Sequence, residues 1–515
     1  MNDYPRTTPS ALTRAAERFG ELTAVSDGDA QLTFAQLHER VRRFAAALVT
    51  RGVEAGSRVA VWAPNTHHWV VAALGVHHAG GVVVPINTRY TGTEAAEIAQ
   101  RVNAEALVVA GNFLGADRLA QIRAADPAFD VATIVRIPLG GDDAPDDSVT
   151  EFDDFLALAT ASALTEADRR ADAVSPDDVA DILFTSGTTG KSKGVLSAHR
   201  QSMGVAQAWA ECAEMRSSDN YLIINPFFHS FGYKAGILVC LLSGATMVPM
   251  TVFDVPKVME KIHEEQISVF PGAPTIYQSI LDHPDRAKYQ LSSLRLAVTG
   301  AAPVPVALVE RMQNELEFEA VLTAYGQTEA VVVTMCRTGD DPVTISTSSG
   351  RAVPGMEVRL GEQNELLVRG SDVMLGYLDD PEATAKTIDR YGWLHTGDVA
   401  TIDDRGYVDI TDRLKDMYIS GGFNVYPAEV EQTLARIEGL AESAVIGIPD
   451  ERMGEVGRAF VVALPGSDVT EDSILEFCRD RLAKFKIPRD VRFVDTLPRN
   501  PSGKVLKNDL REENS

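Results

Sequence analysis

The sequence predicts an α/β protein in which a large N-terminal domain of mostly parallel sheets with helices precedes a small C-terminal α+β domain. Its 515 residues exceed the size of one compact core, so at least two domains are expected. Short apolar runs typical of buried strands alternate with helical patterns, which indicates parallel sheets covered on both faces. The last hundred or so residues have an αβ pattern and are the size of a small domain.

Composition narrows the classes of partner. A net charge of −25 argues against nucleic acid, whose binding needs clustered Lys and Arg, and against anionic membranes. The most apolar stretch, Ile237 to Met250, is too short and too interrupted to cross a bilayer, so no membrane insertion is expected. The N-terminus shows no apolar signal sequence. The cysteines are far apart and lack metal-ligand spacing, which indicates reduced, buried thiols in a cytoplasmic protein: Cys212, Cys240, Cys336 and Cys478.

The N-terminal elements follow from local signals. Thr33-Phe34-Ala35-Gln36 forms a capping box, and apolar residues at helical spacing run from Phe34 to Leu48, which predicts a helix ending at Arg51-Gly52. Residues 59–62 and 81–85 are predicted strands on either side of a helix over 69–78. Residues 140–178, rich in Asp, Ala and Ser, are expected to form a partly helical excursion whose only role is solvation. Four histidines lack carboxylate or thiol partners nearby, so we interpret them as core or surface residues: His67, His68, His77 and His78.

A loop rich in glycine, hydroxyl and lysine side chains follows the apolar strand over 181–184 and runs from Thr185 to Gly194. Glycines let the backbone approach oxygen atoms, N–H groups and hydroxyls donate to them, and lysines neutralise their charge, so the loop suits a polyphosphate. It is not a Walker A loop, which needs four residues before its Gly-Lys pair, whereas two separate Gly187 from Gly190. A flexible, solvated connector is the alternative that this composition leaves open.

Later motifs carry complementary chemistry. Residues 323–329, Thr-Ala-Tyr-Gly-Gln-Thr-Glu, offer an aromatic face for a base, a hydroxyl for a phosphate and a carboxylate for Mg²⁺, which on nucleotides takes one or two protein carboxylates. In residues 392–398, Gly-Trp-Leu-His-Thr-Gly-Asp, Asp398 could accept from both hydroxyls of a ribose. The predicted strands near 269 and over 296–300 end in Gly/Pro turns, and ligands of open α/β sheets bind at such carboxyl ends.

In this order the motifs resemble those of the adenylate-forming superfamily, which comprises acyl-CoA synthetases, luciferases and the adenylation domains of peptide synthetases. Thr185 to Gly194 is similar to its phosphate loop, Thr-Ser-Gly-Thr-Thr-Gly-x-Pro-Lys-Gly, with Ser192 in place of proline and Lys193 at the lysine. The resemblance covers essentially the whole chain. It implies the layered acyl-CoA synthetase fold and an ATP-dependent acid–CoA ligase that uses ATP, Mg²⁺ and CoA. In such enzymes a carboxylate attacks the α-phosphate of MgATP, and the CoA thiol then displaces AMP from the acyl-adenylate.

The resemblance also implies roles for individual residues. Catalysis is expected from Lys504 in the adenylation step, His229 at the reacting carboxylate, Thr328, and Glu329 as the Mg²⁺ ligand. The acid pocket is expected to include His229, Phe231, Tyr233, Lys234, Gly300 and Gly326, with Tyr233 and Lys234 as candidate donors to a ketone; a solvated helix position is the alternative for Lys234. Nucleotide and CoA are expected to contact Thr185, Ser186, Gly187, Thr188, Thr189, Gly190, Lys193, Gly300, Ala301, Ala302, Pro303, Thr323, Tyr325, Gly326, Asp398, Arg413, Gly421 and Gly422.

The same resemblance places the domain boundary. We expect an AMP-binding domain with the acid pocket over 1–414 and a mobile domain over 415–515, with Lys415 as the hinge. Rotation of the C-terminal domain would bring Gly421 and Gly422 to the pantetheine tunnel. A side chain at Gly422 would narrow this tunnel. The expected partners are a small-molecule carboxylic acid, ATP and CoA, and a homo-oligomer is compatible with the sequence.

At a finer level, residues 225–229, 231–237, 274–279 and 412–427 are similar to ligases of bacterial sterol degradation that attach CoA to the propanoate chain of a methylhexahydroindanedione. This resemblance implies the same kind of acid and a place in steroid catabolism. A medium-chain fatty or aryl acid ligase and a ligase that loads a carrier protein remain open. A binding paralogue without catalysis is disfavoured because Lys193, Glu329, Asp398, Arg413 and Lys504 are all present.

Overall fold

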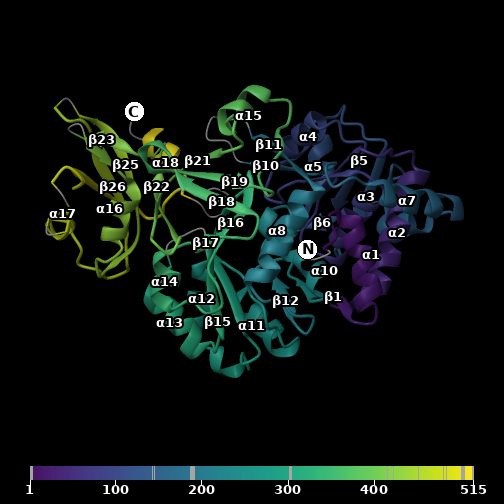
Figure 1. Ribbon diagram of the computed structural model, residues 1–515, viewed down its shortest axis with the longest axis horizontal. Coiled ribbons are helices and arrows are strands. Elements are labelled where there is room, and N and C mark those ends of the chain that lie inside the picture. The colour runs from purple at the N-terminus through teal and green to yellow at the C-terminus, as the bar shows by residue number, and fades with distance from the viewer. Residues whose placement is uncertain are drawn as a thin grey trace. The chain divides into compact units, whose positions relative to one another are not determined.

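The computed structural model describes residues 4–141, 143, 145–185, 192–300, 304–414, 416–420, 423–450, 452–479, 481, 482, 484–499 and 505–512. The chain forms two compact units (Figure 1), one of Met1–Val358 with Val368–Leu394 and one of Arg359–Leu367 with His395–Ser515. The predicted α/β class with a small C-terminal domain is observed. Residues 395–414 pack with the second unit, whereas the prediction assigned them to the first domain. Lys415 lies outside the described residues, and its hinge role stays a prediction.

An eight-stranded sheet forms the centre of the first unit. Its strands are β3 (Arg58–Trp62), β4 (Val82–Pro85), β5 (Ala106–Ala110), β8 (Thr133–Ile137), β9 (Val149–Glu151), β10 (Val179–Thr185), β11 (Lys193–Ala198) and β20 (Gly376–Tyr377), in the spatial order β20-β11-β10-β4-β3-β5-β8-β9. The run from β10 to β9 is parallel, as predicted, whereas β11 pairs antiparallel with both β10 and β20. The loop between β10 and β11 therefore opens at the carboxyl end of a parallel strand.

Two four-stranded sheets complete the first unit's strand layers. The first has the order β12 (Asn220–Ile223), β13 (Thr246–Pro249), β1 (Thr23–Asp27), β2 (Ala30–Thr33), and the second has the order β14 (Leu296–Gly300), β15 (Ala320–Gln327), β16 (Ala330–Met335), β17 (Arg351–Ala352). Val269 forms parallel bridges to Tyr221 and Leu296, which join the two sheets. A short hairpin of β6 (Asn112–Phe113) and β7 (Ala116–Asp117) lies apart from them.

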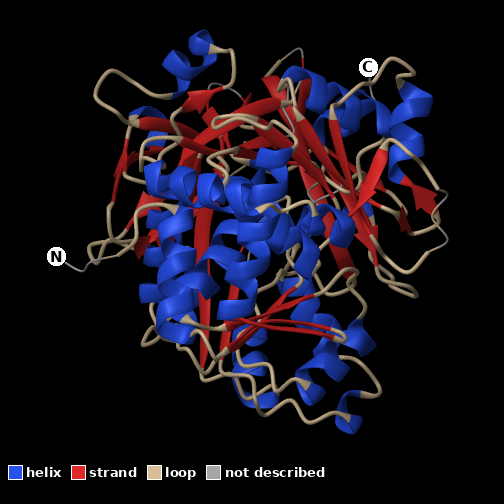
Figure 2. Cartoon of the chain, turned by 90° about the vertical axis from the view of Figure 1, so that its right-hand side faces the viewer, coloured by secondary structure: helices blue, strands red, loops and turns tan. Residues whose placement is uncertain are grey.

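Helices cover the strands of the first unit (Figure 2). The predicted helix after the capping box is α2 (Phe34–Thr50), and the side-chain oxygens of Thr33 and Gln36 each accept from the backbone amide of the other residue, as expected. The helix expected from Tyr233 onward starts as a π-helix, η1 (Tyr233–Leu238), before continuing as α10 (Val239–Ser243). The others are α1 (Thr8–Phe19), α3 (His67–His78), α4 (Gly92–Arg101), α5 (Arg118–Ala125), α6 (Phe152–Ala157), α7 (Ala161–Ala173), α8 (His199–Cys212), α9 (Ser230–Gly232), α11 (Val255–Glu264), α12 (Pro274–Leu281), η2 (Arg286–Lys288), α13 (Val306–Glu315), α14 (Pro342–Thr347) and α15 (Pro381–Thr387).

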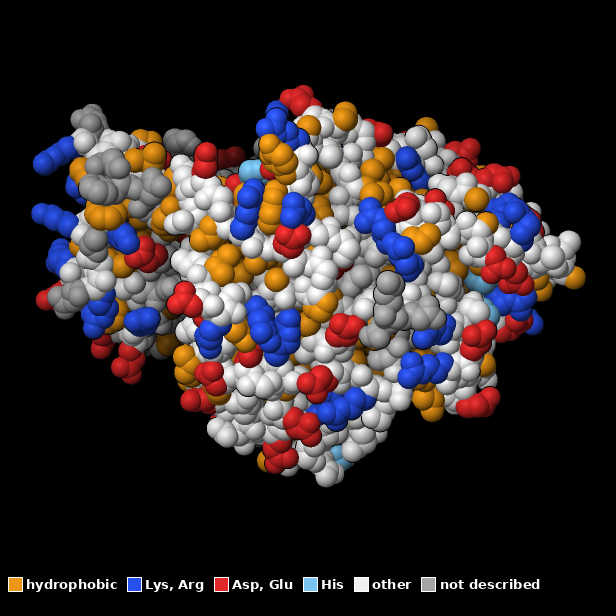
Figure 3. Space-filling view, in the orientation of Figure 1, with side chains coloured by type: hydrophobic (Ala, Val, Ile, Leu, Met, Phe, Trp, Pro, Cys, Tyr) orange, Lys and Arg blue, Asp and Glu red, His pale blue; other side chains and the backbone are white. Residues whose placement is uncertain are grey.

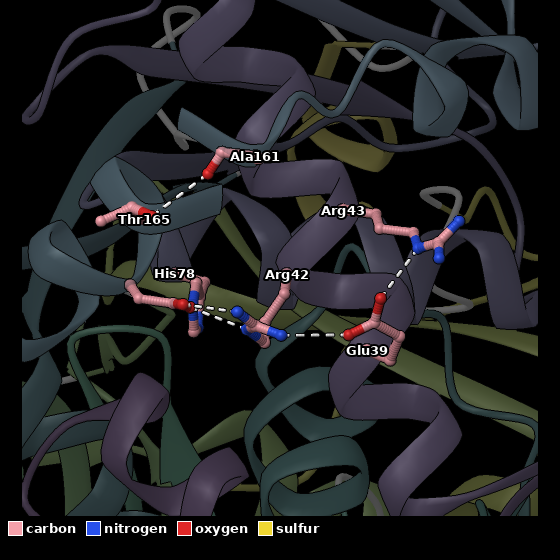
Figure 4. A network of polar contacts seen from close by, with 7 residues as sticks. Glu39, Arg42, Arg43, His78, Ala161 and Thr165 are labelled. Atoms are coloured by element: carbon pink, nitrogen blue, oxygen red, sulfur yellow. Dashed lines mark hydrogen bonds and ion pairs between the residues drawn. The ribbon is translucent and has the colours of Figure 1, made fainter. Parts of the chain in front are cut away.

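The expectation that solvation is the only role of residues 140–178 is wrong, because this segment contacts helices of the first unit. Asp168 of α7 accepts from Nε of Arg42 on α2 at 2.8 Å and lies 3.1 Å from Nε2 of His78 on α3. Figure 4 shows Arg42 in this network, where it also donates to Glu39. Two phenylalanine rings of α6 pack on α2 as well. The acidic segment therefore fixes α2 against α3 through charged and aromatic contacts that its composition did not reveal.

His77 and His78 are buried, in line with their interpretation as core residues, but the expectation that these histidines lack carboxylate partners is wrong. Oδ2 of Asp27 lies 2.8 Å from Nδ1 of His67, and Oδ1 of Asp168 lies 3.1 Å from Nε2 of His78. Within the described ranges, no three His, Cys, Asp or Glu side chains gather as they would around a metal ion held by protein alone. Burial lowers the pKa of His77, His78 and His68, the last to about 4.

The second unit contains the strands β21 (Leu394–Ile402) and β22 (Val408–Arg413), which with β18 (Met356–Leu360) and β19 (Glu365–Gly370) follow the order β18-β19-β21-β22. A further sheet has the order β24 (Phe423–Val425), β23 (Tyr418–Ser420), β26 (Gly454–Ala463), β25 (Leu440–Asp450), with β27 (Asp490–Phe493) beside β26. Helices α16 (Pro427–Leu434), α17 (Glu471–Arg479) and α18 (Lys507–Glu512) accompany it, and a core around Val430, Val445 and Ile474 unites these elements. This is the predicted α+β composition.

Acidic and basic side chains are interspersed over the face drawn in Figure 3. Across the described part of the chain, no helix has both the length and the apolar composition needed to cross a membrane.

Candidate functional site

Thr185 and Lys193 stand at the base of the predicted phosphate loop. They lie opposite each other where β10 ends and β11 begins, and the hydroxyl of Thr185 donates to the carbonyl oxygen of Lys193 at 3.4 Å. This base lies at the carboxyl end of β10, the edge of an α/β sheet at which ligands bind. The predicted contacts within the loop lie outside the described residues: Ser186, Gly187, Thr188, Thr189 and Gly190.

Gly300 and Gly326 lie where two backbones approach each other closely. A Cβ atom at Gly300 would lie 2.6 Å from the carbonyl oxygen of Ala324 on the neighbouring strand, and one at Gly326 would lie 2.5 Å from the backbone nitrogen of Val332. Because a Cβ atom does not tolerate such distances, both positions require glycine for the fold itself. The contacts predicted directly after Gly300 lie outside the described residues: Ala301, Ala302 and Pro303.

The β15–β16 hairpin carries the motif over 323–329. Thr323 is buried, and its hydroxyl donates to the carbonyl oxygen of Ser348 at 2.8 Å, so the proton of this hydroxyl is engaged inside the chain. Tyr325 and Thr328 are partly exposed. Val332 on the returning strand has a φ of 56°, a left-handed conformation that is unusual for a β-branched residue. Such strain clusters at functional sites, which supports a site at this hairpin.

Tyr377, which motif analysis did not single out, joins Glu329 to Lys193. Its phenol donates to Oε1 of Glu329 at 2.9 Å, and the ammonium of Lys193 lies 4.6 Å from the centroid of its ring. The structure therefore brings together the predicted Mg²⁺ ligand and the predicted phosphate-loop lysine. No local signal marks Tyr377, because it is 48 residues from Glu329 and the contact arises from the pairing of β20 with β11.

His229 begins the short α9 turn, and its Nδ1 accepts the backbone amide of Phe231 at 3.2 Å. Solvent reaches His229, yet desolvation by the surrounding protein lowers its pKa. Phe231 is partly buried and packs edge-to-face on Trp209, with ring centroids 5.3 Å apart. Contact of His229 and Phe231 with the acid stays a prediction.

Tyr233 and Lys234 are buried, and their polar atoms have partners inside the chain. The Tyr233 hydroxyl lies 2.5 Å from Nε2 of His77. The ammonium of Lys234 donates to the Ser197 hydroxyl at 2.8 Å and lies 3.0 Å from Oδ1 of Asp181, and Lys234 is only 1% exposed. The interpretation of Lys234 as a solvated helix residue is wrong. Because both side chains are shut off from solvent and their polar atoms contact buried groups of the chain, this geometry does not support donation to a substrate ketone.

In the second unit, Asp398 and Arg413 face each other across β21 and β22, with Arg413 Nε 2.7 Å from Asp398 Oδ1. The Asp398 side chain is 2% exposed and that of Arg413 35%. Two residues expected at the ribose and phosphates are thus paired, and the ion pair holds the carboxylate in one orientation. Four predicted site residues of this unit lie outside the described residues: Lys415, Gly421, Gly422 and Lys504.

Comparison with known proteins identifies the class. A family model described as AMP-binding enzyme matches residues 12–378, and a model described as AMP-binding enzyme C-terminal domain matches residues 429–504. The chain therefore belongs to the family of AMP-binding enzymes, and the resemblance inferred from its motifs is confirmed.

The similar proteins refine this class. The 7a-methyl-1,5-dioxo-octahydro-1H-inden-4-yl propanoyl:CoA ligase of Rhodococcus jostii strain RHA1 is 73% identical over 513 residues, which cover 100% of both chains. The ligase of the same name from Mycobacterium tuberculosis strain H37Rv is 57% identical over 514 residues, covering 99% of each. ATP-bound MatB from Rhodopseudomonas palustris matches in fold with a TM-score of 0.85 at 30% identity, over 98% of each chain. The chain is an AMP-forming acyl-CoA ligase with ATP and CoA as substrates.

Proposed function

We propose that this ligase attaches CoA to the propanoate side chain of a fused two-ring diketone left by the breakdown of a steroid, the methylhexahydroindanedione propanoate. The observation that carries the proposal is the 73% identity, over 100% of both chains, to the Rhodococcus jostii ligase named for that acid. A feruloyl-CoA synthase and a medium-chain acyl-CoA ligase are 36% and 32% identical, so they support an aryl or fatty acid much less.

In the first step an oxygen of the propanoate attacks the α-phosphorus of ATP, and pyrophosphate leaves. Such transfers depend mainly on positioning and charge neutralisation. Lys193, at the base of the loop, supplies positive charge for the β- and γ-phosphates. Asp398, oriented by Arg413, accepts from the ribose hydroxyls. Lys504 reaches the carboxylate and the α-phosphate in this step.

We assign Mg²⁺ to Glu329, with the Thr328 hydroxyl beside it. The donor set fits a nucleotide-bound ion, which takes one or two protein carboxylates and fills its shell with phosphate oxygens and water. The phenol of Tyr377 holds Oε1 of Glu329 in place and so orients the carboxylate. When bound, the ion would neutralise charge on the phosphates.

In the second step the sulfur of CoA attacks the acyl-adenylate carbonyl carbon, and AMP leaves. We propose that the domain over 415–515 rotates about Lys415 for this step. Gly421 and Gly422 would then line the pantetheine tunnel, where the absence of side chains leaves room. His229, whose pKa desolvation lowers, is a neutral imidazole beside the reacting carboxylate at physiological pH.

We place the enzyme in the cytoplasm. All four cysteines are free and buried, which suits a reducing compartment.

The acid is tested with the purified enzyme, MgATP and CoA. The methylhexahydroindanedione propanoate, octanoate and ferulate are compared by the formation of AMP and of each CoA thioester. We expect kcat/KM for the diketone acid to exceed the others at least tenfold. A higher value for octanoate or ferulate would overturn the assignment. Transfer of the acid to a carrier protein's pantetheine in preference to free CoA would favour the carrier-loading alternative.

A further inference from the structure

We propose that Tyr377 is a positioning residue that sets both the Mg²⁺ carboxylate and the phosphate-loop lysine of this ligase. The proposal rests on the function proposed above, because it takes Glu329 as the metal ligand and Lys193 as the phosphate contact. Its basis is a single side chain that touches both groups from a third strand.

The contact with Glu329 fixes the carboxylate. Tyr377 is 8% exposed, and its phenol donates to Oε1 of Glu329 at 2.9 Å. A tyrosine phenol is protonated at neutral pH, so Tyr377 is the donor in this hydrogen bond. With Oε1 engaged, rotation of the carboxylate is restricted before a cation arrives. Partners that orient a metal-binding carboxylate in this way typically contribute about 10–100-fold to metal affinity or activity.

The contact with Lys193 acts on the phosphate loop. The lysine ammonium lies 4.6 Å from the centroid of the Tyr377 ring, inside the distance of about 6 Å at which a ring face attracts a cation. Lys193 is the first residue of β11, directly after the loop. A lysine side chain has many rotamers, and the ring restricts them near the loop base. Restricting them before the nucleotide arrives lowers the entropy cost of binding its phosphates.

The backbone around Tyr377 holds the ring where both contacts are made. Residues 373–378, called the strap here, bridge two elements of the first unit. At one end, Val373 pairs with Ala330 and the amide of Met374 donates to the carbonyl oxygen of Glu329 at 2.8 Å. At the other end, the amide of Leu378 donates to the carbonyl oxygen of Gly194 at 2.7 Å. The strap therefore connects the Glu329 hairpin to the strand that leaves the phosphate loop, and Tyr377 lies between these anchors.

Two substitutions separate the contacts. Tyr377→Phe removes the hydrogen bond to Glu329 and keeps the ring beside Lys193, whereas Tyr377→Leu removes both. Mn²⁺ binding is followed by electron paramagnetic resonance in the presence of a non-hydrolysable α,β-methylene ATP, a readout that does not depend on turnover. We expect Tyr377→Phe to raise the Mn²⁺ Kd tenfold or more while leaving the Kd of the metal-free analogue unchanged. Tyr377→Leu should in addition weaken binding of the metal-free analogue about threefold.

Tyr221→Phe is the matched control. Tyr221 is also buried, and its hydroxyl donates to the carbonyl oxygen of Ala235 at 2.9 Å, so this variant loses a comparable hydrogen bond away from Glu329 and Lys193. Its Mn²⁺ Kd should equal that of the unmodified enzyme. Equal Kd values for Tyr377→Phe and Tyr221→Phe would overturn the positioning role.

Glu329→Gln distinguishes this failure from failure of the proposed function. If Glu329→Gln loses Mn²⁺ affinity and Tyr377→Phe does not, the metal site stands and the inference about Tyr377 falls. If Glu329→Gln also binds Mn²⁺ normally, the assignment of Mg²⁺ to Glu329 is wrong, and the role of Tyr377 falls with it.

Discussion

Replacing Lys234 by methionine should destabilise the whole first unit rather than alter the choice of acid. Lys234 is 1% exposed and Asp181 0%, and their charged atoms lie 3.0 Å apart. Methionine has nearly the length of lysine without its charge. The substitution therefore leaves the Asp181 carboxylate buried without its cation, although Ser202 still donates to Oδ2 at 2.9 Å.

The magnitude follows from this geometry. At 3.0 Å and an effective dielectric constant of about 20, the attraction between two unit charges is about 5–6 kcal/mol. Removing one partner of a buried pair typically costs about 3–5 kcal/mol, since the remaining charge keeps its desolvation penalty. Whole domains are stable by only about 5–15 kcal/mol, so the loss is a large fraction of the total. A lost hydrogen bond to a substrate ketone would leave the unfolding free energy unchanged.

Urea unfolding followed by tryptophan fluorescence measures the effect where it occurs, because Trp62, Trp69, Trp209 and Trp393 all belong to the first unit. Lys234→Met and Asp181→Asn are each expected to lower the free energy of unfolding by about 3–5 kcal/mol. The double variant should lose at least about 2 kcal/mol less than the sum, because it contains no unpaired buried charge and the amide oxygen introduced by Asp181→Asn can still accept from Ser202.

Lys386→Met provides the same substitution in an exposed pair. Lys386 and Glu382 lie 2.7 Å apart with 74% and 80% of their side chains exposed, so this variant should stay within about 0.5 kcal/mol of the unmodified enzyme. If Lys234→Met unfolds at the same urea concentration as Lys386→Met and loses kcat/KM only for the diketone acid, the ion-pair argument is refuted. The role of Lys234 as a ketone donor would then be restored.

Three further predictions concern the two half-reactions and pH. Lys504→Ala should abolish adenylation, measured by pyrophosphate exchange, while sparing thioester formation from supplied acyl-adenylate; equal loss of both would contradict its role in one step only. Gly422→Leu should do the reverse if Gly422 lies at the pantetheine tunnel as proposed, because the added carbon atoms would narrow that tunnel; normal thioester output would show that the tunnel runs elsewhere. Burial raises the pKa of Asp372 to about 7, so the folded state holds a proton that the unfolded state releases near pH 4, and stability should fall as pH rises between these values. Asp372→Asn should therefore gain roughly 2–3 kcal/mol over the unmodified enzyme between pH 5 and pH 8 in urea unfolding, and a constant difference would refute the raised pKa.

Much of the fold and the chemistry of the site could be predicted from the sequence because the signals are local. The capping box at Thr33 and the apolar spacing behind it act within one helix, and α2 begins and continues as they indicate. The strand runs at 59–62 and 81–85 are buried on both faces, as a parallel sheet under helices requires. Each of the three binding motifs, over 185–194, 323–329 and 392–398, contains its polar groups within a few residues. The binding of a nucleotide and its phosphates could therefore be inferred before the fold was known.

The tertiary structure alone decided which side chains these groups meet. Lys234 was interpreted as solvated or as a substrate donor, yet the packing of η1 against β10 gives it Asp181 as a buried partner. The acidic segment over 140–178 contributes Asp168 to the contact between α2 and α3. Tyr377 reaches both Glu329 and Lys193 because β20 pairs with β11. Partners distant in sequence meet only through the order of the strands and the packing of helices on them, and local composition does not encode that order.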